Sequence, residues 1–238
     1  MKKTTDTGIK NIINKLTILA VSSLFTFEII LGNIGDVNIL PSFIYGLLLF
    51  YSVLSLTNNN KNRLLLTIAV CVFAAINVAS ILFTLRFFKK FNYIYLIFSS
   101  VAREAYLPVK ILSVFETLAA LFMLYISAVI FIDFIKNNDV ISYQNELSDA
   151  MPKSHKALII KSIVLFSWSG LISVVKCINI FLKGNTKIAF SQVTSEGFAT
   201  GTLPWVSTLV FFLCVIFVVY SIYFISEIKN EIRFKNPK

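Results

Sequence analysis

The sequence predicts an all-α integral membrane protein, a bundle of six transmembrane helices with both termini in the cytoplasm. Composition is the first reason: 57% of the residues are hydrophobic, 14% are charged, and the mean hydropathy is +0.79. The second is that apolar runs of about 20 residues recur along the chain, and this length crosses about 30 Å of hydrocarbon. The third is that lysines and arginines gather between the runs, where they set the orientation of membrane helices. We therefore expect a single polytopic domain over residues 1–238.

The net charge of +10 does not indicate nucleic-acid binding, because the basic residues flank apolar runs and there contact anionic lipid headgroups. Cys71, Cys177 and Cys214 each lie in an apolar segment without paired spacing, and His155 is the only histidine. The sequence therefore predicts no metal site and no cofactor. The lipid bilayer is the expected partner, and another membrane protein or a second copy of the chain stays open as a further one.

Short loops join the six expected spans. The first span follows a basic N-terminal stretch, as the core of a signal peptide does. No small-residue cleavage site follows it and Glu28 lies inside it, so we interpret it as an uncleaved helix. Pro41 falls in the first turn of the second span, where its missing N–H costs nothing. The expected spans cover residues 16–34, 40–57, 64–85, 109–135, 157–182 and 204–225.

Orientation follows from the basic residues in the loops. With six spans and the N-terminus inside, the cytoplasmic segments hold 13 lysines and arginines and the outer loops hold seven. Residues 91–102 form a further apolar stretch that is too short to span. Its basic flanks and aromatic residues are typical of an interfacial helix or a re-entrant segment. Counting it as a seventh span would remove the charge difference between the two sides.

Three charged residues lie well inside the expected spans: Glu28, Glu116 and Lys176. Such residues are costly in hydrocarbon and commonly mark substrate or ion sites. At 1.5 Å per residue they lie about 5, 9 and 10 Å from the centres of their helices, all toward the outer face. We hypothesise that they form a substrate- or ion-binding cluster. The alternative is structural: Lys176 extends to the outer headgroups, as we also expect of Lys161 on the inner side.

Small or polar residues at helical spacing predict two faces at which neighbouring helices approach closely. Asn77, in the third expected span, is a further candidate for the substrate or ion site, because an amide in hydrocarbon needs a polar partner. The two faces consist of Cys71, Ala75 and Ala79 on the third expected span, and of Ser169, Ser173 and Cys177 on the fifth.

These features favour a small transporter or a channel-type permease subunit over an enzyme. No HExxH, Walker A or GxGxxG motif occurs, and Ser169 has no histidine on its span with which to form a nucleophilic pair. The alternative is a non-transporting membrane partner, such as an immunity, resistance or assembly factor that binds another membrane protein; an intramembrane enzyme is a distant third. Abundant Lys, Asn, Ile and Phe are typical of AT-rich bacterial genomes and indicate the bacterial cytoplasmic membrane.

Overall fold

The computed structural model describes residues 6–23, 28–30, 36–38, 42–87, 107–137, 153–183 and 204–235. These residues form a helical bundle, and the expected all-α membrane architecture is confirmed. Two strands of three residues each, β1 (Glu28–Ile30) and β2 (Asp36–Asn38), add a short ribbon. The helices are α1 (Asp6–Ser22), α2 (Ser42–Leu54), α3 (Asn60–Phe87), α6 (Leu107–Asn137), α7 (Lys153–Lys183) and α8 (Pro204–Lys235).

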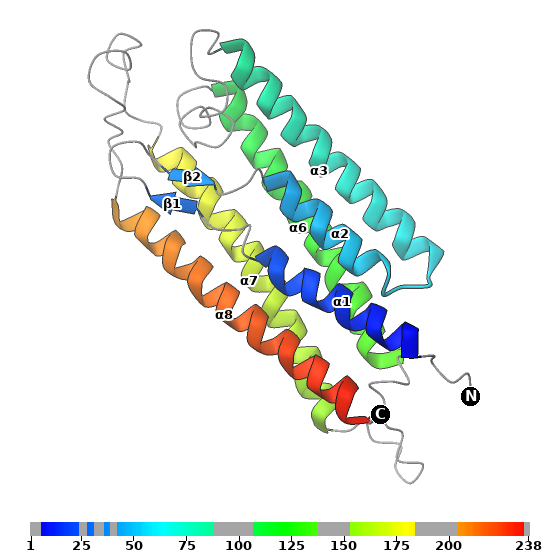
Figure 1. Ribbon diagram of the computed structural model, residues 1–238. Coiled ribbons are helices and arrows are strands. Elements are labelled where there is room, and N and C mark those ends of the chain that lie inside the picture. Colours follow the sequence, from blue (N-terminus) through cyan, green and yellow to red (C-terminus); the bar gives the residue numbers. More distant parts are fainter. Residues whose placement is uncertain are drawn as a thin grey trace.

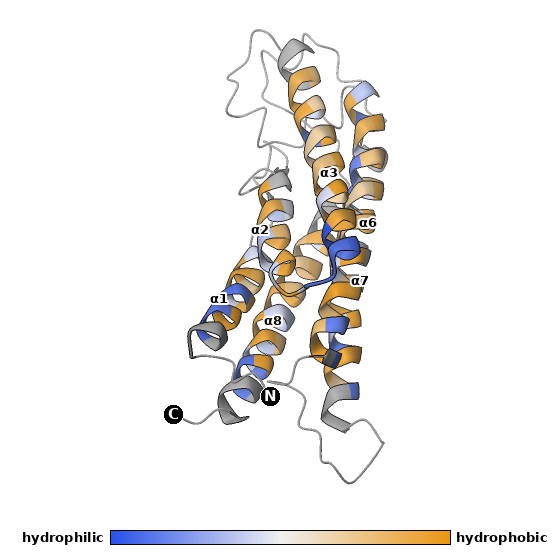
Figure 2. Ribbon diagram, turned by 90° about the vertical axis from the view of Figure 1, so that its right-hand side faces the viewer, coloured by the Kyte–Doolittle hydropathy of each residue, from blue (hydrophilic) through white to orange (hydrophobic). Residues whose placement is uncertain are grey.

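Four of the described helices are long and apolar enough to cross a bilayer, over Asn60–Phe83, Leu107–Lys136, Lys156–Phe181 and Thr208–Asn230. At most half of each of these windows is buried in the bundle. The faces that point outward are nonetheless apolar, which in water would be a large exposed hydrophobic surface. The chain is therefore a multi-pass membrane protein (Figure 2). Large apolar side chains on the outward faces include Leu64, Ile68, Val72, Leu118, Phe122, Tyr125, Ile216, Val219 and Tyr223.

Successive helices alternate in direction, so that α1 begins and α8 ends at the same end of the bundle (Figure 1). We name this the inner end, and the opposite end, where α3 ends and α6 begins, the outer end. Around the bundle α1 contacts α2 and α8, α2 contacts α3 and α6, and α7 lies between α6 and α8. Together with the contact between α3 and α6, this order of contacts closes a ring of helices.

The last four expected spans lie within α3, α6, α7 and α8, which extend into polar residues at one end or both. The second expected span, 40–57, contains the shorter helix α2. The turn after it is built from polar contacts: the Asn59 side-chain oxygen accepts a hydrogen bond from the Lys61 N–H at 3.0 Å. This is the contact of a helix N-cap, and it fixes the start of α3.

The first expected span is wrong. We expected one helix over 16–34, but α1 ends at Ser22, and Glu28 begins strand β1. Strands β1 and β2 pair antiparallel with Ile29 opposite Val37, and β-branched residues favour such pairing. The ribbon lies near the outer ends of α7 and α8 (Figure 1). A continuous helix would have held the Glu28 carboxylate close to the centre of the hydrocarbon, where a charge is costly.

The stretch 91–102, expected to be interfacial or re-entrant, lies outside the described residues, as does His155's side chain. The inner half of the bundle contains an aromatic core and polar contacts between α7 and α8. Its core is aromatic: the Phe131 ring lies 5.8 Å from the Phe166 ring and 6.2 Å from the Phe224 ring, centroid to centroid. These three side chains come from α6, α7 and α8 and join the helices by apolar packing.

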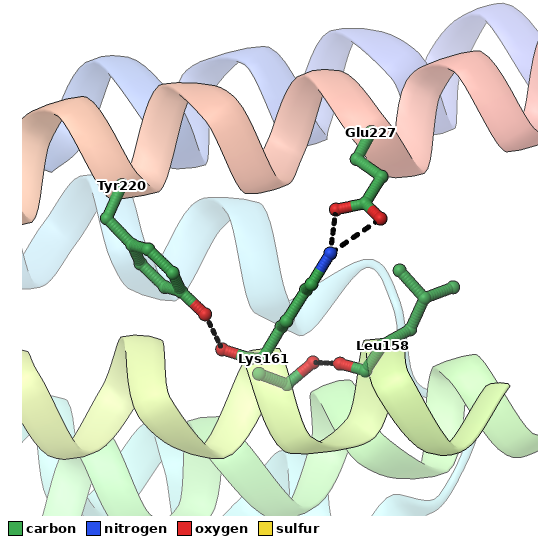
Figure 3. A network of polar contacts seen from close by, with 5 residues as sticks. Leu158, Lys161, Tyr220 and Glu227 are labelled. Atoms are coloured by element: carbon green, nitrogen blue, oxygen red, sulfur yellow. Dashed lines mark hydrogen bonds and ion pairs between the residues drawn. The ribbon is translucent and has the colours of Figure 1, made fainter. Parts of the chain in front are cut away.

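Polar contacts join α7 to α8 along the same half (Figure 3). Both carboxylate oxygens of Glu227 accept hydrogen bonds from the Lys161 ammonium, at 2.6 and 2.7 Å. The Tyr220 hydroxyl donates to the Lys161 carbonyl at 3.0 Å. At the middle depth, the Trp168 indole N–H donates to the Leu213 carbonyl of α8 at 3.0 Å. We had expected Lys161 to extend to the headgroups, but the structure pairs it across the helix interface.

Candidate functional site

A small cavity lies where α1 ends, between α1, α2, α7 and α8. Leucine and phenylalanine side chains form part of its wall, and hydroxyl groups form the rest. Its volume is about 10 Å³, close to the minimum that holds one water molecule. The hydroxyl groups belong to Ser22, Ser23, Tyr45, Ser169 and Ser221.

The cavity lies at the middle depth of the bundle. Ser169 is at the midpoint of the α7 span Lys156–Phe181, and Ser221 is close to the midpoint of the α8 span Thr208–Asn230. Helix α1, which starts at the inner end, reaches only this depth before it stops at Ser22. The cavity therefore combines a central position with the carboxyl end of an interrupted helix.

The end of α1 is closed by its own serines. The Ser22 hydroxyl donates to the Leu19 carbonyl at 2.7 Å, and the Ser23 hydroxyl donates to the Ala20 carbonyl at 2.6 Å. Both carbonyls belong to the last four of α1, which have no N–H partner within the helix. A hydroxyl carries a single proton, so each serine oxygen can meet any further neighbour only as an acceptor.

Two further hydroxyls meet across the centre of the ring. The Tyr45 hydroxyl of α2 and the Ser169 hydroxyl of α7 are hydrogen-bonded at 2.8 Å, and either can be the donor. Ser169 is 3% exposed. Ser221 of α8 is 1% exposed, and its hydroxyl makes no hydrogen bond within the described ranges. The cavity thus has one buried hydroxyl that still lacks a partner from the surrounding helices.

Glycines beside the bonded pair let the helices approach. A Cβ atom on Gly46, next to Tyr45, would lie 2.7 Å from Cε1 of Phe73 on α3. A Cβ atom on Gly170, next to Ser169, would lie 3.0 Å from a methyl carbon of Leu121 on α6. A side chain at position 46 would therefore require the Phe73 ring to move, whereas one at position 170 would displace the Leu121 methyl group only slightly.

The predicted charges Glu116 and Lys176 lie outward of the cavity, on α6 and α7. Near the outer end, the Lys110 ammonium donates to the Phe181 carbonyl at 3.3 Å. Further in, Leu121 contacts Gly170. Glu116 and Lys176 lie between these two contacts on their helices. Their equal depth stays a prediction.

The side chains of this outer layer are buried to different extents. Glu116 is 7% exposed and Lys110 is 8% exposed, whereas Lys176 is partly exposed. The third predicted charge, Glu28, lies in β1, and the contacts of its side chain lie outside the described part of the chain. Asn77 is 3% exposed and donates to the Phe73 carbonyl of its own helix at 2.9 Å. Binding of a substrate or ion by these residues stays a prediction.

The two expected small-residue faces differ. Cys71 and Ala75 are exposed and Ala79 is partly exposed, so this face points mostly away from the bundle, and the close approach of another helix to it stays a prediction. Helix α3 instead turns larger side chains inward, such as that of Phe73, which is buried. A bulky buried side chain makes many more van der Waals contacts than a small one. On α7, Ser169 points into the bundle, Ser173 donates to the Ser169 carbonyl at 3.1 Å, and Cys177 is partly buried.

Sequence reasoning missed most of the cavity, since it singled out only Ser169 among the lining hydroxyls. The adjacent pair Ser22–Ser23 inside an apolar run was a usable signal, because serines favour positions where a helix can end. Within the described ranges, no group of three or more His, Cys, Asp or Glu side chains is placed to hold a metal ion. No known protein family, curated protein or solved structure matches this chain.

Proposed function

We propose that this protein transports a solute across the bacterial cytoplasmic membrane, and that the transport path passes the hydroxyl-lined cavity. The observation that carries the proposal is the end of α1 at the middle depth of the bundle, against the hydroxyls of Tyr45, Ser169 and Ser221. A purely structural bundle has no need to interrupt a helix there.

Interrupted helices at membrane depth have a physical cost. Each backbone polar group that loses its helical partner needs another, since hydrocarbon offers none. Such breaks are tolerated where the backbone is buried in protein or lines a polar cavity. In many transporters, binding sites near the middle of the membrane are built from broken helices for this reason. The position of α1's end beside a polar cavity fits this arrangement.

The outer layer supports the same proposal. Lys110, Glu116 and Lys176 place charged groups between the cavity and the outer end, along α6 and α7. Buried charges in membrane helices are unfavourable for stability and are retained where solutes or protons move. We propose that Glu116 and Lys176 line the outer part of the path, where they contact the solute or a coupled ion.

Cysteine accessibility tests the proposed path without knowledge of the solute. Cys71, Cys177 and Cys214 are first replaced by alanine, and Ser169→Cys is then compared with Ser127→Cys. Ser127 is also fully buried and donates to a backbone carbonyl, that of Met123 at 2.8 Å, but it does not line the cavity.

We expect a small hydrophilic thiol reagent, which enters when the transport path opens, to label the cysteine at 169 at least tenfold faster than the cysteine at 127. The reagent is applied to the protein in membranes, and labelling is followed by mass spectrometry. Equal and slow labelling at both positions would show that water does not reach the centre of the bundle, and the proposed path would then be wrong.

A further inference from the structure

We infer that the cavity at the end of α1 binds a dehydrated monovalent cation of the size of sodium. The inference rests on the proposed function, since it assigns an ion to the same central site. It follows from four properties of the cavity: the kind of atoms in its wall, the helix end that faces it, the absence of formal charge among its lining residues, and its size.

The wall offers oxygen acceptors. Ser22 donates its proton to the Leu19 carbonyl of α1, so its oxygen atom offers the cavity lone pairs only. Tyr45 and Ser169 are hydrogen-bonded to each other, and both oxygen atoms keep further lone pairs. Hydroxyl and carbonyl oxygens are the ligands that hard cations prefer in proteins. The wall also keeps two hydroxyl protons, one from the Tyr45–Ser169 pair and one from Ser221, so the preference for a cation over an anion comes from the helix end.

The helix end adds a favourable field. The carboxyl end of an α-helix carries about −0.5 of an elementary charge, spread over its last carbonyl groups. Helix α1 directs this end at the cavity, since Leu19, Ser22 and Ser23 all line it. At the middle depth of a membrane, little water is present to screen the field. A cation is stabilised there and an anion is repelled.

Formal charge and size narrow the choice of cation. None of the lining residues carries a carboxylate, whereas calcium and magnesium sites draw on carboxylates to balance two positive charges. The neutral wall therefore suits a single positive charge. The central room of about 10 Å³ admits one particle no larger than about a water molecule, so a hydrated ion does not fit. A dehydrated sodium ion does.

Ser221 supplies an independent observation. Its side chain is 1% exposed and lines the cavity, and its hydroxyl makes no hydrogen bond within the described residues. A helical serine can usually satisfy its hydroxyl with a carbonyl one turn earlier, as Ser127 and Ser162 do at 2.8 Å. The hydroxyl of Ser221 is thus left for an occupant of the cavity.

Sodium-dependent stabilisation of the purified full-length protein tests the inference. The Tm is measured in sodium chloride and in choline chloride at equal ionic strength, and binding of radioactive sodium is measured on the same sample. Because a ligand that binds only the folded state raises stability, we expect sodium to raise the Tm by about 5 °C at saturation. Choline is too large for the cavity and provides the baseline.

Variants locate the sodium site. Ser22→Ala, Ser169→Ala and Ser221→Ala each remove one oxygen from the wall, and we expect sodium affinity to fall about tenfold or more in each, as for hydrogen bonds to charged groups. Ser127→Ala and Ser162→Ala are the matched controls, because both serines are fully buried and neither lines the cavity. Three cavity variants are used so that one that fails to fold leaves two others.

The outcomes separate this inference from the proposed function. If sodium neither binds nor raises the Tm above the choline baseline, the cavity holds only water and the inference is wrong. It is equally wrong if sodium stabilises the cavity variants and the controls alike, since the ion then binds elsewhere. Labelling at Ser169→Cys tests the transport path and does not require sodium. If the cysteine is labelled but sodium does not bind, the proposed path stands and only the inferred sodium site is wrong.

Discussion

The two halves of the bundle differ in what they bury. The inner half buries aromatic and branched apolar side chains, among them Phe131 and Phe224, both fully buried. Its ion pair, Lys161 with Glu227, lies at the rim with about a third of each side chain exposed. The outer half buries the charged side chains of Lys110 and Glu116. We conclude that the inner half supplies most of the packing stability, and that the outer half and centre give up stability for polar sites.

The largest expected loss of stability comes from a substitution in the inner half. Phe131→Ala removes a fully buried ring that packs against Phe166 and Phe224, and we expect a loss of about 3–5 kcal/mol in the free energy of unfolding. The matched control is Phe122→Ala on the same helix, whose ring is 45% exposed on the outward face. Denaturant unfolding in detergent measures both, and a comparable loss in the two variants would contradict the assignment of the core.

A smaller effect compares two lysines. Lys110 is 8% exposed. Within the described residues its ammonium donates one hydrogen bond, to the Phe181 carbonyl at 3.3 Å, and lies 4.9 Å from the centroid of the Phe181 ring. Replacing a poorly satisfied buried charge by an apolar group is often neutral or stabilising, so we expect Lys110→Met to raise stability by about 1 kcal/mol.

Lys161→Met has the opposite expected sign. It removes the partner of the Glu227 carboxylate, and we expect stability to fall by about 1 kcal/mol or less, because the pair is partly exposed. Thermal unfolding of the two variants side by side gives the comparison. If both replacements lower stability, then Lys110 stabilises the fold. The proposed difference in stability between the inner and outer halves would then be smaller.

The long helices could be predicted from the sequence because the need to cross hydrocarbon is a strong constraint. Their apolar runs match this length, and α3, α6, α7 and α8 contain the expected spans. The position of Glu116 and Lys176 between the centre and the outer end of the bundle was also predictable, since helices rise by a constant amount per residue. Both inferences need only distances along a helix, and these are encoded locally.

The end of α1 and the cavity could not be predicted in the same way. Residues 16–34 contain no proline, and their hydropathy does not distinguish a helix from a helix that stops and continues as a ribbon. The five hydroxyls come from four helices, and single serines or tyrosines in apolar runs are commonplace. Their convergence depends on which faces the helices turn toward each other, as the outward rotation of Cys71 and Ala75 also shows.

The most direct test of the central claim compares two cysteines on α1. Ser22 lines the cavity, whereas Leu16, almost two turns earlier, is fully buried in the apolar core. With the native cysteines replaced by alanine, we expect a hydrophilic thiol reagent to label Ser22→Cys at least tenfold faster than Leu16→Cys in native membranes. Equal labelling, or labelling of Leu16→Cys alone, would contradict an α1 helix that ends at a polar cavity in the centre of the bundle.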